Sequence, residues 1–391
     1  EPFDYSKARW LGPVLSGMVF LLFILAIASA GKMLGVAVFG DASLTPGNSL
    51  GIGAVTVALI GAPFVIWRSV VAQKSVDVQE QGHITDRINK AVEGLGAEKT
   101  VKRRVVVHET FTPGAAFAGK RAEYATSEHT EPNLEVRIGA IYALERISQD
   151  SARDHIQIME ILCAYIRENA KLMDPFAEEL LDPKRERVRL RSDIDAAIKV
   201  IGRRPAELIQ EARAFFSKGI YRKRFDLRGV DLCGSELQDL AFHDIEFNGS
   251  SFQRANLMNT LFDNVTFNYS DFSGAITWKA NAKADCTFSY CLFSGLESLE
   301  IIMPLKRDRV LWCAVRDTKF ACADLRELLQ EKLSLLSIWF GDQSVYLPNS
   351  VIDCEKETGP SHWPQSVLDI KTFVQQWRRW QKEGPDYKPP E

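Results

Sequence analysis

The sequence predicts a membrane-anchored α+β fold, in which two transmembrane helices precede a helical linker or cap unit, a short quadrilateral β-helix and a C-terminal helical cap. Three observations lead to this prediction. Leucine or phenylalanine recurs at every fifth position from Leu227 to Phe272. Two long stretches near the N-terminus contain no charged residue. Apolar residues at helical spacing flank the repeat on both sides.

The five-residue repeat is the most informative of the three. Its apolar positions are Leu227, Leu232, Leu237, Phe242, Phe247, Phe252, Leu257, Phe262, Phe267 and Phe272. Helices and strands have side-chain periods of about 3.6 and about 2, so neither accounts for this spacing. A fixed short repeat indicates stacked units, and four such sides per turn give a square parallel β-helix. We therefore expect each of these positions to be buried at the centre of a coil and the next residue to be exposed.

The repeat resembles the pentapeptide-repeat family, whose usual unit is A-[DN]-[LF]-x-x. The best matches are Ala255–Asn259 and Ser270–Gly274. The resemblance implies that the quadrilateral β-helix is right-handed. The phase is lost after Phe272, and Phe288 and Phe293 resume it one residue out of step. Later positions in fives are Leu305, Val310, Val315, Phe320 and Leu325. We therefore assign the β-helix, with two or three loops pushed out of it, to residues 225–327.

Residues 1–75 are predicted to form a transmembrane hairpin. Trp10–Gly31 and Ala42–Trp67 carry no charge, and each is long enough to cross ~30 Å of hydrocarbon as a helix. Basic residues flank the pair, namely Lys7, Arg9, Arg68 and Lys74, whereas the connecting loop has only Lys32. This bias predicts a membrane protein with both termini in the cytoplasm, and the bacterial inner membrane is implied by the resemblance of Leu134–Ile147 to segments of bacterial membrane proteins. A cleaved signal peptide ending near residues 28–30 is the alternative interpretation of the first stretch.

Residues 76–224 are predicted to form a cytoplasmic, HEAT-like helical unit with a strand and loop insertion. The expected elements are a helix over 85–94, a strand over 101–110, a loop or half of a hairpin over 113–130, and helices that begin near Asn133, Ser151, Ser192 and Ala206. Leu134–Ile147 and Ile194–Arg204 are similar to segments of bacterial membrane proteins that combine two transmembrane helices with pentapeptide repeats. We expect this unit to cap the first coil, because an open β-helix end exposes unpaired backbone groups.

Residues 328–391 are predicted to form a C-terminal cap and tail. One apolar helical face comprises Val367, Ile370, Phe373, Val374 and Trp377, with Trp380 beside it. We expect this helix to join Trp339, Phe340 and Trp363 in an aromatic cluster that closes the second end of the β-helix. The alternative is a helix that lies on the membrane surface, aided by Lys371, Arg378 and Arg379.

The sequence contains no recognisable catalytic motif, so we expect no enzymatic activity, no cofactor and no metal site. Phosphate-loop, serine-hydrolase and zinc-protease motifs do not occur, and no two of the six histidines have the spacing of metal ligands. Cys286 and Cys291 each precede a repeat centre by two residues, which predicts buried core thiols. Seven cysteines without a CxxC pair are typical of a reducing compartment.

These features favour a non-enzymatic scaffold, anchored in the inner membrane, that displays its β-helix to a protein partner of unknown identity. The candidate interaction surface comprises Asp226, Asp231, Glu236, Asp244, Trp363, Trp377 and Trp380. The lipid bilayer and a second copy of the chain are the other expected partners. One alternative is an oligomerising membrane effector, in stress or antiphage defence, that perturbs the bilayer. A third is an acidic regulator that mimics DNA. Nucleic acid is not an expected partner, because a net charge of −3 provides no bulk attraction.

Overall fold

The computed structural model contains two compact units, Glu1–Asp86 and Arg87–Glu391. It describes residues 81–110, 121–177, 190–217, 224–283, 285–296, 310–316, 338–345 and 360–389, together with isolated positions between 17 and 79. The sequence predicts three domains after the hairpin, namely the helical unit (76–224), the β-helix (225–327) and the C-terminal cap (328–391). All three fall almost entirely within the second unit.

The first unit contains the two predicted membrane spans. Ala42–Trp67 lies outside the described residues, and so does most of Trp10–Gly31. The described positions of the first span are helical, and their large apolar side chains are exposed: Phe20, Leu21, Ile24, Leu25 and Ile27. Within the described part of the chain, no helix has both the length and the apolarity needed to cross a membrane.

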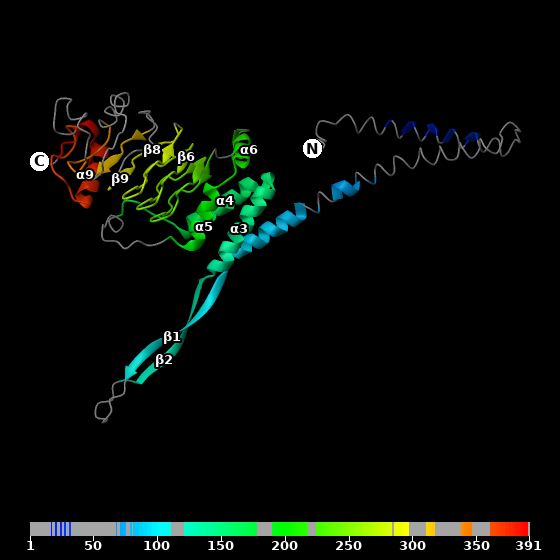
Figure 1. The fold of residues 1–391 in the computed structure, drawn as a ribbon, viewed down its shortest axis with the longest axis horizontal. Helices are drawn as coiled ribbons and strands as arrows, with labels where there is room; N and C mark the ends of the chain where they lie inside the picture. Colours follow the sequence, from blue (N-terminus) through cyan, green and yellow to red (C-terminus); the bar gives the residue numbers. More distant parts are fainter. Residues whose placement is uncertain are drawn as a thin grey trace. The chain divides into compact units, whose positions relative to one another are not determined.

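The helical unit contains two strands, whereas the sequence predicts one strand followed by a loop or half of a hairpin. Residues 81–95 are helical, and the bounds of the following elements are β1 Glu98–Thr110, β2 Arg121–Pro132, α3 Leu134–Asp150, α4 Ala152–Asn169, α5 Ser192–Gly202 and α6 Ala206–Ser217. Strand β2 pairs with β1 in an antiparallel ribbon (Figure 1), so this stretch is the second half of a hairpin. The four helices begin within two residues of the predicted positions.

Apolar stripes hold helices α3, α4 and α5 together. Ile141 and Leu144 of α3 and Ile158 and Leu162 of α4 are fully buried, as their spacing of three or four residues predicts. Arg191 Nε lies 2.7 Å from Oδ1 of the buried Asp193. Buried charges of this kind are tolerated only when they are paired, so this ion pair fixes how α5 begins.

The central segment is a parallel β-helix, as predicted. Its strands are β3 Phe225–Asp226, β4 Ala241–His243, β5 Ile245–Glu246, β6 Leu261–Asp263, β7 Asn281–Ala282, β8 Phe288–Ser289, β9 Leu292–Ser294, β10 Val310–Leu311 and β11 Ala314–Arg316. Pairing joins residues one coil apart, such as Phe225 with Ile245 and Phe242 with Phe262. The pairing of Val315 with Phe293 confirms the late repeat position at Val315, whereas Leu305, Phe320 and Leu325 lie outside the described residues.

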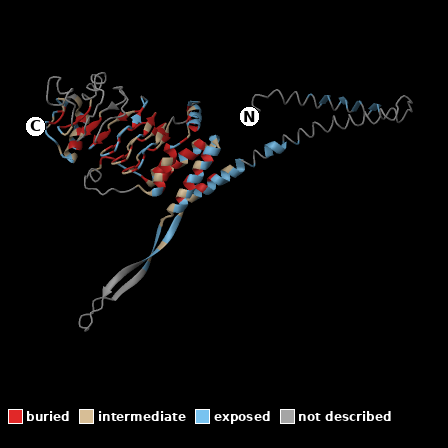
Figure 2. Ribbon diagram, in the orientation of Figure 1, coloured by how far each residue is buried: buried red, intermediate tan, exposed pale blue. Residues whose placement is uncertain are grey.

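The core of the β-helix consists of the predicted centres, and none of those from Leu227 to Phe272 is more than 3% exposed. Figure 2 shows this buried interior in red. Phenylalanine rings stack from coil to coil, as in Phe247 on Phe267 with ring centroids 5.7 Å apart. Hydroxyl groups in the smaller inner slot are also buried, and three of the four donate to backbone carbonyls, as Ser270 Oγ does to the oxygen of Phe247 at 3.0 Å. The fourth, Ser235 Oγ, is buried without a hydrogen-bond partner among the described residues.

Of the ten residues that follow the centres Leu227 to Phe272, two are exposed, five are half-buried and three are buried, so the expectation that they are exposed is wrong at the last three and holds only in part at the five. Cys233, Gln253 and Asp263 are each less than a tenth exposed. Their side chains point outward, but they are covered or paired there: Gln253 Nε2 donates to Asp271 at 2.6 Å, and Lys283 Nζ lies 2.7 Å from Asp263. The repeat period sets which way a side chain points, whereas its exposure depends on what packs against that side.

The helical unit caps the first coil through backbone hydrogen bonds. The amide of Asp231 donates to the carbonyl of Ala170, and the amide of Leu172 donates to the carbonyl of Gly229, each at 2.7 Å. These bonds extend the edge of the first coil with residues that follow α4, which removes an exposed strand edge. The predicted role of the helical unit as a cap is consistent with these contacts.

The last described coil is closed by Trp363. Phe340 bridges Ala314 in parallel, so Gly341 takes the place of a repeat centre. A Cβ atom on Gly341 would lie 2.7 to 2.8 Å from three ring atoms of Trp363. The indole therefore fills the space that a centre side chain would occupy, and its Nε1 donates to the carbonyl of Trp339 at 2.8 Å.

Helix α9, Ile370–Glu383, covers a side of the β-helix and continues into the short 3-10 helix η3, Gly384–Asp386. We define the covered face as the outward column Asp231, Ser251, Asp271, Leu292, Ala314 and Phe340. Phe373, Val374, Trp377 and Trp380 of α9 pack on the later members of this column. The prediction that the helix docks is thus confirmed, but it lies on a side and leaves the end to Trp363. Val367, expected on the apolar face, is exposed because the helix begins only at Ile370.

Candidate interaction surface

The four acidic residues of the predicted surface do not share one face. Asp226, Asp231 and Glu236 are five residues apart, and in a four-sided coil that spacing moves each to the next side. Asp244 lies at a corner with a φ of 57°. Residues that lie side by side on one face are about twenty apart, as Glu236 and Asn256 are. The sequence contained this signal, because a twenty-residue register follows directly from the five-residue repeat.

Two of these acids are neutralised within the chain. Asp226 pairs with Arg167 at 3.1 Å and with Arg228 at 2.9 Å. Burial raises the pKa of Asp226, but hydrogen bonds from Arg228 and its neighbours outweigh this effect and bring the pKa to about 2. Asp244 Oδ2 accepts from Arg213 at 2.8 Å. Asp226 and Asp244 are therefore structural ion pairs that hold α4 and α6 against the coil.

The remaining two acids have different surroundings. Asp231 is half-buried on the covered face, where its Oδ1 accepts from the amide of Cys233 at 3.0 Å. Glu236 is exposed, and its Oε2 accepts from Asn256 Nδ2 at 2.9 Å. Of the predicted acids, only Glu236 is fully exposed on an outward face.

The three predicted tryptophans belong to the interior of the cap. Trp363, Trp377 and Trp380 are 3%, 1% and 5% exposed. Trp377 packs edge-on against Phe176 with centroids 5.2 Å apart, and its Nε1 donates to the carbonyl of Trp312 at 3.1 Å. The structure therefore places these indoles in the folded core, where a partner cannot reach them without displacing α9.

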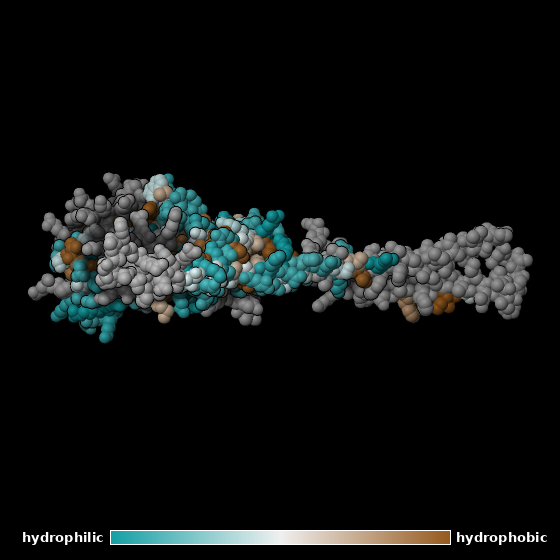
Figure 3. Space-filling model, turned by 90° about the horizontal axis from the view of Figure 1, so that it is seen from below, coloured by the Kyte–Doolittle hydropathy of each residue, from teal (hydrophilic) through white to brown (hydrophobic). Residues whose placement is uncertain are grey.

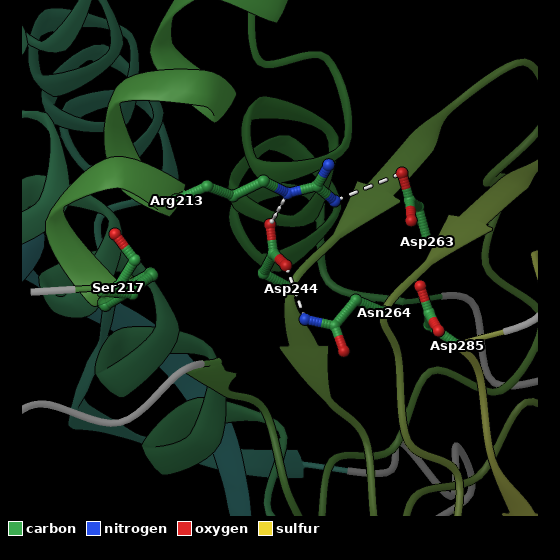
Figure 4. A pocket seen from close by; sticks show the side chains of 7 residues that line it. Arg213, Ser217, Asp244, Asp263, Asn264 and Asp285 are labelled. Atoms are coloured by element: carbon green, nitrogen blue, oxygen red, sulfur yellow. Dashed lines mark hydrogen bonds and ion pairs between the residues drawn. The ribbon is translucent and has the colours of Figure 1, made fainter. Parts of the chain in front are cut away.

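A charged pocket of about 380 Å³ lies between α6 and the corner of the first coils. Figure 4 shows Arg213 reaching from α6 toward Asp244 and Asp263, with Nη2 3.2 Å from Asp263. The remaining lining residues are Phe216, Ser217, Asn264 and Asp285. Lys283 is a second cation on Asp263. Because the carboxylates of Asp244 and Asp263 are both paired with cations, the charged groups of this pocket stabilise the contact between α6 and the β-helix.

His243 lies beside this pocket and is the histidine that comes nearest to a catalytic arrangement. Its Nδ1 is 3.3 Å from Asp263 Oδ2, a proximity that the twenty-residue register could have predicted. Burial lowers the pKa of His243 and outweighs the opposing effect of Asp263, so the imidazole is neutral near pH 7. Asp263 is also held by Arg213 and Lys283, which leaves it a weak proton acceptor for His243.

The predicted core cysteines occupy the inner slot. Cys286 and Cys291 are fully buried, and Cys291 Sγ lies 2.6 Å from the carbonyl oxygen of Phe267. Burial raises the pKa of Cys286 to about 11, which leaves the thiol protonated and unreactive. Among the residues that the structure describes, no cluster of three or more histidine, cysteine or acidic side chains is placed to bind a metal ion.

On one side of the β-helix, no other element of the described residues packs against the outward side chains. We define the open face as Glu236, Asn256 and Ile276 in one column and Gln238, Met258 and Trp278 in the next. Ile276 is 49% exposed and Trp278 is 48% exposed. The described surface seen in Figure 3 is mostly hydrophilic, with apolar residues in separate patches. Two large apolar side chains next to each other on a rigid face are therefore a distinctive feature.

Comparisons with known proteins agree with the architecture of the central segment. The family model for pentapeptide repeats (8 copies) matches residues 242–276. Among solved structures, the chain is similar to QnrB1, a plasmid-mediated fluoroquinolone resistance protein, at 15% identity over 32% of this chain and 70% of that chain, with a TM-score of 0.19. It is also similar to a pentapeptide repeat protein from the Arabidopsis thaliana thylakoid lumen, at 18% identity over 30% of this chain and 77% of that chain, with a TM-score of 0.21. A comparison with curated proteins gives no match.

Proposed function

The central segment of this chain is a pentapeptide-repeat β-helix, and from this premise we propose that the protein is a non-enzymatic scaffold that binds a protein partner through the open face. We further propose that the first unit anchors it in a bacterial inner membrane with both termini in the cytoplasm. The observation that carries the binding proposal is the exposed pair Ile276 and Trp278 on a rigid surface.

The polar part of the open face is ordered before any partner binds. Asn256 Nδ2 donates to Glu236 at 2.9 Å and to Gln238 at 3.4 Å. At the adjoining corner, Asn259 Nδ2 donates to Asp239 at 2.9 Å. Side chains that are fixed in this way lose little conformational entropy on binding, which is the cost that usually limits affinity. The face therefore suits a partner that recognises a flat surface.

The apolar part of the open face supplies the binding energy. Trp278 lies in the third coil, and Lys279 Nζ is 4.3 Å from the centre of its ring. Tryptophan is enriched among the residues that dominate protein interfaces, because it buries a large area with few rotatable bonds. A cation beside the ring suits a partner with an acidic rim around an apolar centre.

The alternative of an acidic DNA mimic finds less support than a protein-binding face. Asp226 and Asp244, two of the acids on which that alternative depends, pair with Arg167, Arg228 and Arg213. A charge array that imitates DNA needs regularly spaced unpaired anions, because phosphate charge dominates what a DNA-binding protein recognises.

The membrane proposal rests on the sequence and on the exposed apolar positions of the first unit. Phe20 is 67% exposed and Ile27 is 58% exposed, in a stretch without charged residues. Basic residues on both outer flanks support the cytoplasmic placement of the termini. Reporter fusions at residue 40 and at the C-terminus test it, and an extracytoplasmic C-terminus would contradict it.

The binding proposal is tested by crosslinking in native membranes, followed by purification of the full chain and identification of its partners. Trp278→Ala should reduce the yield of a specific partner about 30-fold, the effect of losing a dominant interface residue worth about 2 kcal/mol. The matched control is Tyr142→Ala, because Tyr142 is 46% exposed on α3 and also lies beside a cation, Arg203.

Equal loss in both variants, or unchanged capture with Trp278→Ala, would contradict the open face as the binding surface. Overexpression gives a second readout. Loss of membrane potential on overexpression would favour the oligomerising membrane effector over the scaffold.

A further inference from the structure

The β1–β2 ribbon is the element whose role the scaffold proposal leaves unexplained. It is a two-stranded sheet, and its longer strand of 13 residues spans about 40 Å. The pairing is regular from Glu98 with Pro132 to Val106 with Tyr124, and shifts between Val106 and His108. Within the described residues, neither outer edge of the sheet pairs with another strand.

An isolated two-stranded ribbon of this length is at best marginally stable in water. Each outer edge presents a row of unpaired amide and carbonyl groups, which is a template for another strand. The described part of the ribbon has little apolar surface of its own, since its side chains at 98–103 and 126–132 are exposed or half-buried. Further pairing along an edge would therefore add to its stability.

The two edges of the ribbon carry opposite charge. Strand β1 carries the basic residues Lys99, Lys102, Arg103 and Arg104 against the acids Glu98 and Glu109. Strand β2 carries the acids Glu123, Glu128 and Glu131 against Arg121. Lys102 Nζ lies 2.7 Å from Glu128, and Arg103 lies 3.0 Å from Glu131, so the ribbon already shows that the two strands are complementary.

We propose that the ribbon is a self-association arm, in which β2 of one copy pairs with the outer edge of β1 of a second copy. In this arrangement each acidic strand lies between two basic strands, and the internal pairing pattern repeats between copies. Pairing of β1 with β1, or of β2 with β2, places like charges opposite each other and is disfavoured. The contact is head-to-tail, so it extends to a ring or to an open array.

The exposed position of these ion pairs makes the proposal testable without unfolding the ribbon. Lys102 and Arg103 are more than 60% exposed, and exposed pairs contribute little to the stability of a single chain. Reversing one strand should therefore change which strands associate, but it also places like charges opposite each other within the ribbon, which the four-fold change removes again.

The experiment uses the full chain in mild detergent and measures molar mass by light scattering. Variant one is Lys102→Glu with Arg103→Glu, and variant two is Glu128→Lys with Glu131→Lys. A third variant carries all four changes, which restores opposite charge on the two strands. Melting curves followed by tryptophan fluorescence confirm that the rest of each variant is folded, and the four-fold variant is the control for the ribbon, whose strands contain no tryptophan.

We expect the wild type and the four-fold variant to associate, and variants one and two to dissociate at least ten-fold more readily. Mixing variants one and two should restore association, because an acidic edge then meets a basic edge. A monomeric wild type, unchanged association in both two-residue variants, or no recovery on mixing would each overturn the proposal. Unchanged association would assign self-association to another part of the chain, and lack of recovery would assign these residues a role within one copy.

Discussion

Asp271 offers the sharpest test of how burial shapes this β-helix. It is fully buried on the covered face, where Gln253 Nε2 donates to one carboxylate oxygen at 2.6 Å and the amide of Ser273 donates to the other at 2.8 Å. Burial raises the pKa of Asp271 from 3.8 to about 6, despite these hydrogen bonds. Near pH 7.5 the folded protein must therefore hold a charged group that its surroundings favour in the neutral form.

The size of the effect follows from the shift in pKa. The difference of about two pKa units corresponds to ~3 kcal/mol. Because the pKa is raised in the folded state, folded protein binds more protons than unfolded protein between pH 6 and pH 4, and stability rises as the pH falls through that range. Asp271→Asn, which resembles the protonated acid, should be more stable than wild type by up to ~3 kcal/mol at pH 7.5 and by close to zero at pH 4.

The assay is urea unfolding of the full chain in mild detergent, followed by tryptophan fluorescence at several pH values. Asp231→Asn is the matched control, because Asp231 belongs to the same column but is half-buried. A stability difference between Asp271→Asn and wild type that stays constant from pH 4 to pH 7.5 would refute the reasoning. So would an identical pH profile in the control.

Three further predictions follow from the same structure. Burial lowers the pKa of His155 to about 4. The stability that this neutral histidine contributes is complete above pH 6.5 and is lost as the pH falls toward 4. His155→Gln should remove this loss of unfolding free energy, up to ~3 kcal/mol, and an unchanged dependence of stability on pH would contradict the prediction. Phe252→Ala should cost about 3–5 kcal/mol and Met258→Ala less than about 1 kcal/mol, and equal melting shifts would contradict the five-residue register. Gly341→Ala should cost about 1–3 kcal/mol, because its Cβ would meet the ring of Trp363, and an unchanged melting temperature would mean that the last coil is not closed by that ring.

The β-helix and the helices could be predicted because their signals are local. The apolar centres recur at every fifth residue from Leu227 to Phe272 without a break, and this period determines that their side chains point into the coil. Helix α4 begins after Ser151 as predicted, where Ser151 Oγ lies 2.7 Å from Asp154. In both cases the residues that decide the local structure lie within five positions of each other.

The position of α9 on a side of the β-helix was not predicted, because it depends on contacts between distant segments. A signal was nevertheless present in the covered face. Its column changes from polar residues in the early coils, such as Asp231 and Ser251, to Leu292 and Phe340 in the later coils. Outward positions that turn apolar indicate that another element packs there, and this pattern becomes visible only in the twenty-residue register.

The sequence predicted one surface with Asp226, Asp231 and Glu236, and the structure places these acids on different sides. Their spacing is the reason, because five residues move the chain to the next side of the coil. A grouping by twenty residues places Glu236 beside Asn256 and Ile276 instead. The open face that we propose as the binding surface therefore contains one of the predicted acids together with apolar residues that charge alone could not identify.

The arrangement of the covering elements supports our proposal that a partner binds at the open face. Helix α9 packs on the covered face, and Arg213 of α6 holds the corner at Asp244. A partner at either place must first displace a part of this chain, which costs the free energy of those contacts. At the open face the side chains of Asn256 and Glu236 are already ordered, and Trp278 is exposed. Binding there adds apolar burial without removing any contact in the described structure.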